Sequence, residues 1–213
     1  MRVAVVNATP ASVQPATDGL AEGFPEAVAW HLMDDRLVTE ADAAGGMTPA
    51  LMRRMLSLID HAVRGGADAV LLSCSMYGPA AKLARQLYDV PVTGSDEAMF
   101  ADVTRRRPGT VLVLGSLESA AADSARRLQD VADGVEVRAV AAPGAAAAAA
   151  AHDWPDLTDA LARTAAPALD EVDLVLLGQY SISPVHAELG ERLGVPVLSP
   201  PLAAAAALRK ALA

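Results

Sequence analysis

The chain has 213 residues, which is enough for one large α/β domain or two small ones with a substantial core. Its net charge of −9 argues against nucleic acid or an anionic membrane as a partner. The single cysteine, Cys74, excludes an internal disulfide and favours a reducing, cytoplasmic location. The apolar run at residues 3–6 is too short for a signal peptide or a membrane span.

Short apolar runs separated by turn residues predict alternating strands and helices in the first half of the chain. Thr48 is a good N-cap for a helix that carries Leu51, Met55, Leu58, Ile59 and Ala62 on one face. The elements expected in this half are strands at 2–7, 27–33, 69–72 and 90–94, helices at 48–63, 80–88 and 97–106, and loops at 8–23 and 34–46.

The second half predicts the same alternation. An alanine tract at 145–151 favours helix by composition, and we interpret it as compositional drift near a loop, without chemistry. The basic run 105–107 indicates a solvated helix end rather than an anion site. The elements expected here are strands at 110–115, 135–140, 173–177 and 195–198, and helices at 119–131, 156–168, 180–193 and 202–212.

The segment 68–79 places Cys74 where a buried strand gives way to a helix. Such junctions lie at the carboxyl edge of a parallel sheet, where open α/β proteins bind ligands. Backbone N–H groups at the start of the helix favour a thiolate, and the polar neighbours Ser73 and Ser75 support a functional cysteine. The alternative is a buried, inert cysteine.

The segment has an internal repeat 105 residues later. Asp68 corresponds to Asp173, and the apolar strand that follows each aspartate leads to Cys74 in one copy and Gln179 in the other. The same offset relates 90–92 to 195–197. Two similar halves predict a pseudo-symmetric pair of α/β units, with the Cys74 and Gln179 loops facing one cleft. The alternative is a chance similarity between two strand–helix junctions.

Several hydroxyl and amide side chains follow predicted strands. Asn7, Thr9 and Ser12 either donate hydrogen bonds to a ligand carboxylate or form ordinary turns. Ser116 and Ser119 either build a carboxylate-binding helix start or simply cap that helix. Histidine spacing gives no metal motif, and no glycine-rich phosphate loop appears, so neither a metal nor a nucleotide is expected.

With these pieces in order, the chain resembles the aspartate/glutamate racemase superfamily over nearly its whole length. The resemblance lies in Asn7, the block 66–75 around Cys74, and the segments 90–92, 95–99 and 176–179. It implies two flavodoxin-like halves, each a parallel four-stranded sheet flanked by helices, with the active site between them. It also implies chemistry without pyridoxal phosphate, metal or nucleotide. Hydantoin racemases, maleate isomerases and arylmalonate decarboxylases are relatives.

The sequence departs from the racemase pattern at Gln179. In the racemases each half supplies a cysteine, and the two thiols exchange the α-proton from opposite faces. Gln179 cannot act as an acid or base near neutral pH, so a symmetric racemisation needs another acid such as Tyr77, Tyr180 or a water. Single-thiol decarboxylases in the superfamily carry their cysteine in the second half, whereas Cys74 lies in the first.

We therefore expect a cofactor-independent enzyme that transfers a proton next to the carboxylate of a small organic or amino acid, as an isomerase, racemase or decarboxylase. The alternative is a non-catalytic carboxylate-binding or regulatory protein. The partners considered are a small carboxylate-containing substrate and a second copy of the chain, in a homodimer or higher homo-oligomer. The expected halves are 1–95 with 199–213, and 96–198. The candidate catalytic residues are Cys74 and Gln179, and the candidate binding residues are Asn7, Thr9, Ser12, Ser75, Met76, Ser116, Ser119, Tyr180 and Ser181.

Overall fold

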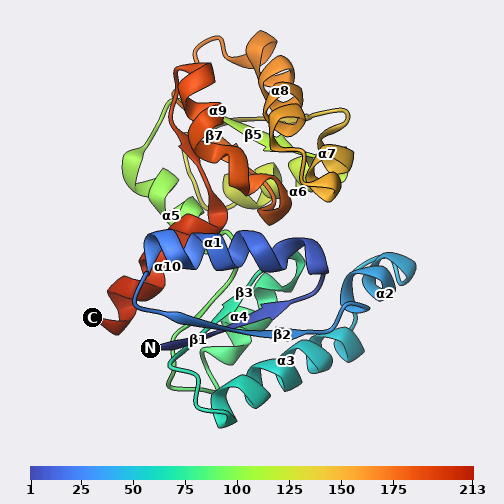
Figure 1. Ribbon diagram of the computed structural model, residues 1–213, viewed down its shortest axis with the longest axis vertical. Coiled ribbons are helices and arrows are strands. Elements are labelled where there is room, and N and C mark those ends of the chain that lie inside the picture. The colour runs from blue at the N-terminus through green and yellow to red at the C-terminus, as the bar shows by residue number, and fades with distance from the viewer. The chain divides into compact units, whose positions relative to one another are not determined.

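A computed structural model describes all 213 residues of the chain. The chain forms two compact units, each with its own sheet of four parallel strands (Figure 1). Unit 1 contains Met1–Ala98 and Pro201–Ala213, and unit 2 contains Met99–Pro200. The predicted fold class, two parallel four-stranded sheets flanked by helices, is confirmed. None of the helices is both long and apolar enough to cross a membrane.

The sheet of unit 1 has the strand order β2-β1-β3-β4. Its central strands are continuous apolar runs, because helices cover both faces of a parallel sheet. Every residue of β3 and every residue of β1 after Arg2 is buried. The bounds are β1 Arg2–Asn7, β2 Val28–Met33, β3 Ala69–Leu72 and β4 Val92–Thr93.

Helices α1 and α3 lie on opposite faces of this sheet (Figure 1). Helix α3 begins as predicted, with the Thr48 hydroxyl accepting a hydrogen bond from the Leu51 N–H. The predicted apolar face of α3 packs on the sheet, with only Leu58 left half-buried. The helices of unit 1 are α1 Val13–Gly23, α2 Leu37–Ala43, α3 Pro49–Arg64, α4 Gly78–Ala84 and α10 Pro200–Leu212, with 3-10 turns at Pro10–Ser12 and Ser75–Tyr77.

The prediction of a loop at 8–23 was wrong, because most of this segment is α1. Its two glycines suggested a loop, yet they allow α10 to pack closely on α1. A Cβ atom on Gly19 would lie 2.7 Å from the Pro201 Cβ, and one on Gly23 would lie 3.0 Å from the Ala205 Cβ. Tertiary packing therefore stabilises a helix whose local propensity is poor.

The prediction of a polar loop at 34–46 was also wrong, because α2 lies inside it. Contacts from distant segments hold this short helix. Leu37 and Ala41 are buried one turn apart, and the Tyr77 hydroxyl donates to the Leu37 carbonyl over 3.1 Å. Arg54 of α3 forms ion pairs with Asp34 and Glu40. These long-range contacts left no pattern in the local sequence.

Unit 2 repeats the sheet of unit 1, with the order β6-β5-β7-β8. The alanine tract is a correction: it forms α7, whose Ala145, Ala148 and Ala149 pack into the core of this unit. The strands are β5 Thr110–Gly115, β6 Glu136–Ala141, β7 Leu174–Leu177 and β8 Val197–Leu198. The helices are α5 Glu97–Arg106, α6 Glu118–Gln129, α7 Ala145–Ala151, α8 Trp154–Ala165 and α9 His186–Leu193, with 3-10 turns at Ala166–Ala168 and Tyr180–Val185.

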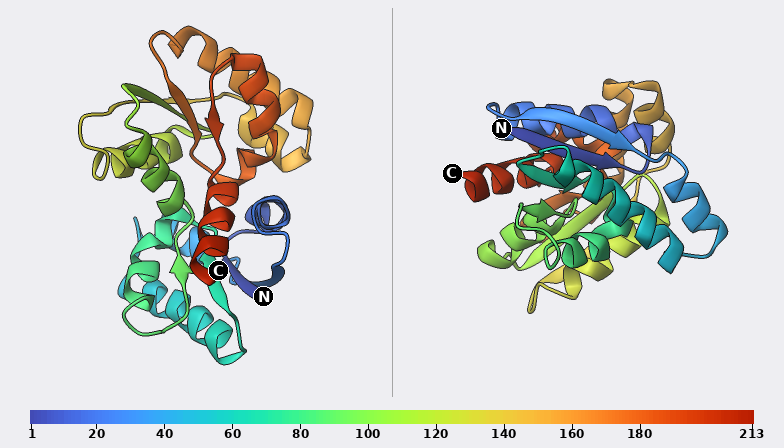
Figure 2. Two further views of the ribbon diagram at one scale, coloured as in Figure 1. Left: turned by 90° about the vertical axis from the view of Figure 1, so that its left-hand side faces the viewer. Right: turned by 90° about the horizontal axis from the view of Figure 1, so that it is seen from below.

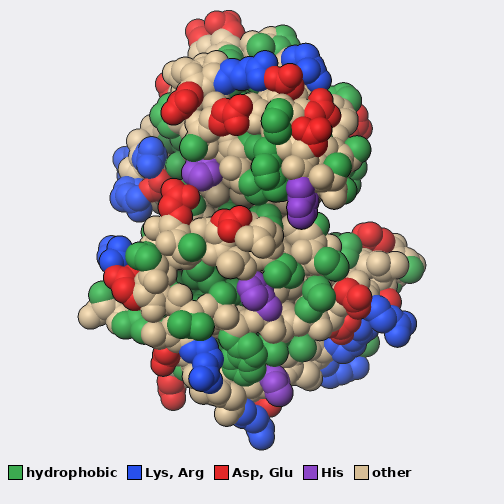
Figure 3. All heavy atoms as spheres, viewed as in Figure 1, with side chains coloured by type: hydrophobic (Ala, Val, Ile, Leu, Met, Phe, Trp, Pro, Cys, Tyr) green, Lys and Arg blue, Asp and Glu red, His purple; other side chains and the backbone are tan.

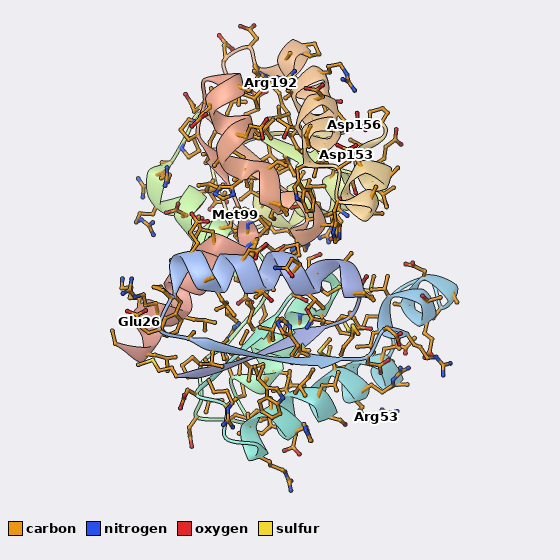
Figure 4. The ribbon with its side chains drawn as sticks, viewed as in Figure 1. Glu26, Arg53, Met99, Asp153, Asp156 and Arg192 are labelled. Carbon is orange, nitrogen blue, oxygen red and sulfur yellow. The ribbon has the colours of Figure 1, made fainter.

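Side chains that cap and link the helices of unit 2 are visible in Figure 4. Asp153 caps α8 by accepting a hydrogen bond from the Asp156 N–H, and Arg192 of α9 forms an ion pair with Asp159 of α8. The basic run at the end of α5 is exposed to solvent, as predicted. Arg105 and Arg106 form ion pairs with Asp102 on the same helix. On the face drawn in Figure 3, acidic and basic side chains both occur on each unit.

Strand register confirms the internal repeat. Val3 pairs with Ala69 in unit 1, and Val111 pairs with Leu174 in unit 2. The two repeated aspartates make equivalent contacts just before β3 and β7. The Arg2 N–H donates to Asp68 over 2.6 Å, and the Gly109 and Thr110 N–H groups donate to Asp173 over 2.7 and 3.1 Å. Each aspartate therefore fixes the start of the third strand of its unit against the first.

Each unit also contains a helix that follows the last strand of the other unit's sheet. Helix α10 follows β8 of unit 2, yet it lies beside α1 of unit 1 (Figures 1 and 2). Its Arg209 forms an ion pair with Glu26, which precedes β2 (Figure 4). Helix α5 follows β4 of unit 1, and its Phe100 packs under the Arg127 guanidinium of unit 2, 5.5 Å from the ring centre.

The contacts of Asp173 predict its effect on stability. Replacing Asp173 with Ala removes the acceptor of two backbone N–H groups at a partly solvated site, so we expect the free energy of unfolding to fall by about 1 kcal/mol. Asp173→Asn keeps an acceptor oxygen and should lose less. Urea unfolding measures both, with Asp170→Ala as a control at a nearby exposed carboxylate. Equal stability of Asp173→Ala and the control would contradict a structural role for the repeated aspartate.

Candidate active site

The candidate residues lie at the carboxyl ends of the two central strands in each unit. In the order β2-β1-β3-β4 the chain leaves β1 toward one edge of the sheet and returns on the other side at β3. A crevice forms at such a switch point, and open α/β proteins bind ligands there. Asn7 ends β1 and Cys74 follows β3, whereas Ser116 follows β5 and Gln179 follows β7. Each sheet therefore brings its candidate residues together at its own switch point.

Cys74 is half-buried and stands at the N-cap position of the 3-10 turn that leads into α4. Its backbone is extended, with φ −117° and ψ 121°, and its carbonyl accepts a hydrogen bond from the Tyr77 N–H over 3.2 Å. The first N–H groups of a helical turn have no acceptor within that turn. Ser75 and Met76 are the first two residues of this turn, and their N–H groups donate no hydrogen bond to another part of the chain. Two unsatisfied donors thus follow the thiol directly.

Tyr77 is poorly placed to supply a second acid. Its side chain is 0% exposed, and its hydroxyl already donates to the Leu37 carbonyl. Burial, with a smaller effect from neighbouring Cys74, raises the pKa of Tyr77 to about 12. The Tyr77 phenol therefore stays protonated near neutral pH, with its proton donated to a carbonyl inside unit 1.

Asn7 and Ser12 lie in a buried polar network beneath Cys74. The Asn7 Oδ1 atom is 3.0 Å from the Ser12 hydroxyl and 2.9 Å from the Ser73 hydroxyl, and the two hydroxyls are 2.8 Å apart. Ser12 is 3% exposed and Ser73 is 5% exposed. The structure therefore gives these side chains partners inside unit 1. Thr9, by contrast, is only half-buried, and its hydroxyl makes no hydrogen bond.

His31 joins the same network and was missed by the sequence analysis. Its Nδ1 atom is 3.1 Å from the Asn7 Nδ2 atom, and its Nε2 atom is 3.0 Å from the Thr17 hydroxyl. Burial lowers the pKa of His31, so the neutral ring is favoured. The available signal was positional, because His31 is the one polar residue in the middle of a strand that pairs with β1.

In unit 2 the side chain of Gln179 is held in one orientation. Its Oε1 atom accepts hydrogen bonds from the Ser116 N–H over 2.8 Å and from the Ser116 hydroxyl over 2.9 Å. The Ser183 hydroxyl donates to the Gln179 carbonyl over 3.1 Å. The Nε2 atom of Gln179 donates to no group within unit 2. The amide therefore presents its N–H donors while its oxygen is occupied.

Helix α6 begins beside this amide without a side-chain cap. Its N-cap residue is Leu117, and the Ser116 hydroxyl is committed to Gln179, so capping by Ser116 is not observed. Ser119 is exposed in the first turn of the helix, and Ser181 is half-buried after Gln179. Tyr180 is buried, 5% exposed, at the start of its 3-10 turn. Helix starts of this kind favour anionic groups.

The chemistry that these groups support is proton transfer and anion binding. Unit 1 offers one thiol beside two backbone donors, and unit 2 offers amide, hydroxyl and helix-start donors. The structure brings no three His, Cys, Asp or Glu side chains together in a group that could hold a metal ion.

Comparison with solved structures finds proteins that share this fold over nearly the whole chain. It resembles the crystal structure of an allantoin racemase from Pseudomonas fluorescens, with a TM-score of 0.71 and 19% identity, over 99% of this chain and 90% of that one. An aspartate racemase from Picrophilus torridus gives a TM-score of 0.75 and 15% identity, over 99% of this chain and 94% of that one. The structure of an unliganded arylmalonate decarboxylase gives a TM-score of 0.71 and 18% identity, over 99% of this chain and 92% of that one.

These identities show a shared fold, and the family assignment rests on the sequence itself. No curated protein sequence matches the chain significantly. The sequence model of the Asp/Glu/hydantoin racemase family, however, matches residues 3–208. That match covers both units and nearly every element described above. The chain therefore belongs to the Asp/Glu/hydantoin racemase family.

Proposed function

We propose that this protein is a cofactor-independent enzyme that moves a proton at the carbon next to a carboxylate of a small organic or amino acid. The observation that carries the proposal is Cys74, a thiol at the switch point of its sheet, followed directly by two unsatisfied N–H groups. Membership of a racemase family and the likeness to racemases and a decarboxylase support an enzyme of this kind.

In the proposed mechanism, the N–H groups of Ser75 and Met76 bind carboxylate oxygen and stabilise the negative charge that builds up in an enediolate. Each well-placed donor of this type contributes about 3–4 kcal/mol to the barrier reduction. The Cys74 thiol gives its proton to the α-carbon of the enediolate, and the resulting thiolate regains a proton from water. In a decarboxylation, the enediolate forms as carbon dioxide leaves with the bond electrons remaining on the α-carbon.

Gln179 has a different role in this proposal. Because its oxygen is held by Ser116, the amide orients a substrate carboxylate or carbonyl through its Nε2 hydrogens. Glutamine has no transferable proton near pH 7. Proton transfer therefore runs through Cys74 alone. The reaction is a decarboxylation, or an isomerisation in which the Cys74 thiolate removes a proton and the thiol returns it on the same face, in preference to a two-thiol racemisation.

A second candidate function follows from the same residue. Replacement of the second thiol by Gln179 also suits a carboxylate-binding or regulatory protein that has kept the fold without the reaction. A thermal-shift screen with small mono- and dicarboxylates identifies the ligand class for either function. Turnover of a stabilising ligand, followed by NMR, then separates the enzyme from the binding protein.

Substitution of Cys74 tests the catalytic thiol. We expect Cys74→Ser to abolish turnover of the carboxylate found in the screen, because a hydroxyl is a far weaker acid than a thiol. Stability in urea should hardly change, since the substitution is small and the site is polar. Iodoacetamide should likewise inactivate the wild-type protein through its one cysteine. Full activity of Cys74→Ser would remove the thiol from the mechanism.

Deuterium incorporation tests the assignment of Gln179. In deuterated water the wild-type enzyme should place deuterium on one face of its product and give one enantiomer in excess, because a single thiol delivers the proton. Gln179→Cys introduces a second thiol and should raise the rate of racemisation of an α-carboxylate substrate. Gln179→Glu, which keeps the shape without a thiol, is the matched control. Equal production of both enantiomers by the wild type would contradict the one-thiol assignment.

A further inference from the structure

A chain of hydrogen bonds, part-buried at Thr17 and His31 and buried at Ser12 and Ser73, runs from α1 across the edge of the sheet to the residue before Cys74. The Thr17 hydroxyl donates to the Val13 carbonyl over 2.9 Å and lies 3.0 Å from His31 Nε2. His31 Nδ1 lies 3.1 Å from the Asn7 Nδ2 atom, and the Asn7 Oδ1 atom accepts hydrogen bonds from the hydroxyls of Ser73 and Ser12. We call these five residues, Thr17, His31, Asn7, Ser12 and Ser73, the histidine relay.

The backbone around Asn7 fixes the direction of the hydrogen bonds that join Asn7, His31 and Thr17. The Asn7 Nδ2 atom lies 3.0 Å from the Val5 carbonyl and 3.4 Å from the Leu32 carbonyl, so this end of the amide must be the donor. His31 Nδ1 then has to accept. The ring carries its proton on Nε2 and donates to the Thr17 oxygen, whose own proton goes to Val13. One tautomer of a neutral His31 satisfies all of these groups.

Unit 2 shows that the fold does not require the relay. By strand register, Gly115 occupies the position of Asn7 and Ala139 that of His31. Gly178 occupies the position of Ser73, since its N–H donates to the Leu114 carbonyl as that of Ser73 donates to the Val6 carbonyl. The same sheet thus forms with small apolar residues at these positions. Buried polar groups destabilise a fold unless every one is paired, so the relay in unit 1 calls for a reason beyond folding.

The position of the relay supplies that reason. Ser73 directly precedes Cys74, and its hydroxyl is anchored by the amide that His31 orients. We propose that His31, as the Nε2–H tautomer, is a positioning residue that acts through Asn7 and Ser73 to hold Cys74 and the N–H groups after it in place. An effect of His31 on turnover rests on the proposed function. The effect of His31 on the position of the Cys74 thiol does not.

The surroundings of His31 suit this fixed role. On strand β1, Asn7 is the polar partner of His31 and the neighbouring side chains are apolar. On α1, the partner of His31 is the Thr17 hydroxyl. The nearest acid along α1, Asp18, is exposed and accepts a hydrogen bond from Gln14 instead. A protonated ring would present a second donor to the Asn7 Nδ2 atom, and rotating that amide would set its oxygen against the Val5 carbonyl. The relay therefore holds His31 neutral and in one orientation.

The positioning is tested with iodoacetamide, which reports on Cys74 alone because the chain has no other cysteine. The second-order alkylation rate at pH 7 should fall about fivefold in His31→Leu, because the loss of one buried hydrogen bond loosens the Cys74 loop. His31→Gln keeps an acceptor and a donor and should stay within about twofold of the wild type. His61→Leu, the same change on α3 outside the relay, is the matched control.

Two further measurements separate positioning from a general loss of structure. If His31 acts through Ser73, the double variant His31→Leu/Ser73→Ala should alkylate at the rate of Ser73→Ala alone. Additive effects, or a wild-type rate in His31→Leu, would overturn the proposal. In the wild-type protein, nitrogen NMR of the histidine ring should show the Nε2–H tautomer at pH 7, and an Nδ1–H or charged ring would also overturn it.

These outcomes do not depend on turnover. If Cys74→Ser keeps full activity while the alkylation cycle behaves as expected, the proposed function fails and the positioning stands. If Cys74→Ser loses activity while His31→Leu alkylates like the wild type, the proposed function survives and the relay fails.

Discussion

Parallel pairing of the first and third strands is the interaction on which the rest of each unit depends. Val6 pairs with Leu72 in unit 1, and Leu114 pairs with Leu177 in unit 2. Because parallel strands point the same way, the residues that follow them meet at one edge of the sheet. Pairing in this register sets Asn7 beside the backbone that leads to Cys74, and Ser116 beside Gln179. The repeated aspartates secure the opposite ends of the same strands.

On this shared backbone the two units have acquired different side-chain chemistry. Unit 1 combines a thiol with a hydrogen-bonded set of hydroxyl, amide and imidazole groups, of which Asn7, Ser12 and Ser73 are buried. Unit 2 is apolar at the positions that match Asn7, His31 and Ser73, and Ser116 makes two hydrogen bonds to Gln179 beside them. The two units thus share a strand order and differ in the side chains at the carboxyl ends of their central strands.

The sequence predicted those parts of the fold that leave a local pattern. The strands, α3 and the Cys74 junction follow from apolar periodicity and turn residues, and the repeat followed from spacing. Helices α1 and α2 were missed because distant contacts stabilise them: Gly19 fits against Pro201, and Arg54 holds α2. His31 was missed for a related reason, since a histidine in a strand acquires its partners only when strand register is known.

The placement of α10 has a consequence for how the protein is made. The final helix completes unit 1 by packing on α1, although some hundred residues of unit 2 lie between α4 and α10 in the chain. During synthesis from the N-terminus, the sheet of unit 1 emerges from the ribosome long before the helix that covers α1. Until α10 is translated, the glycine face of α1 stays open, and Cys74 belongs to a unit that is still incomplete. Unit 1 therefore cannot finish folding before unit 2 has been synthesised.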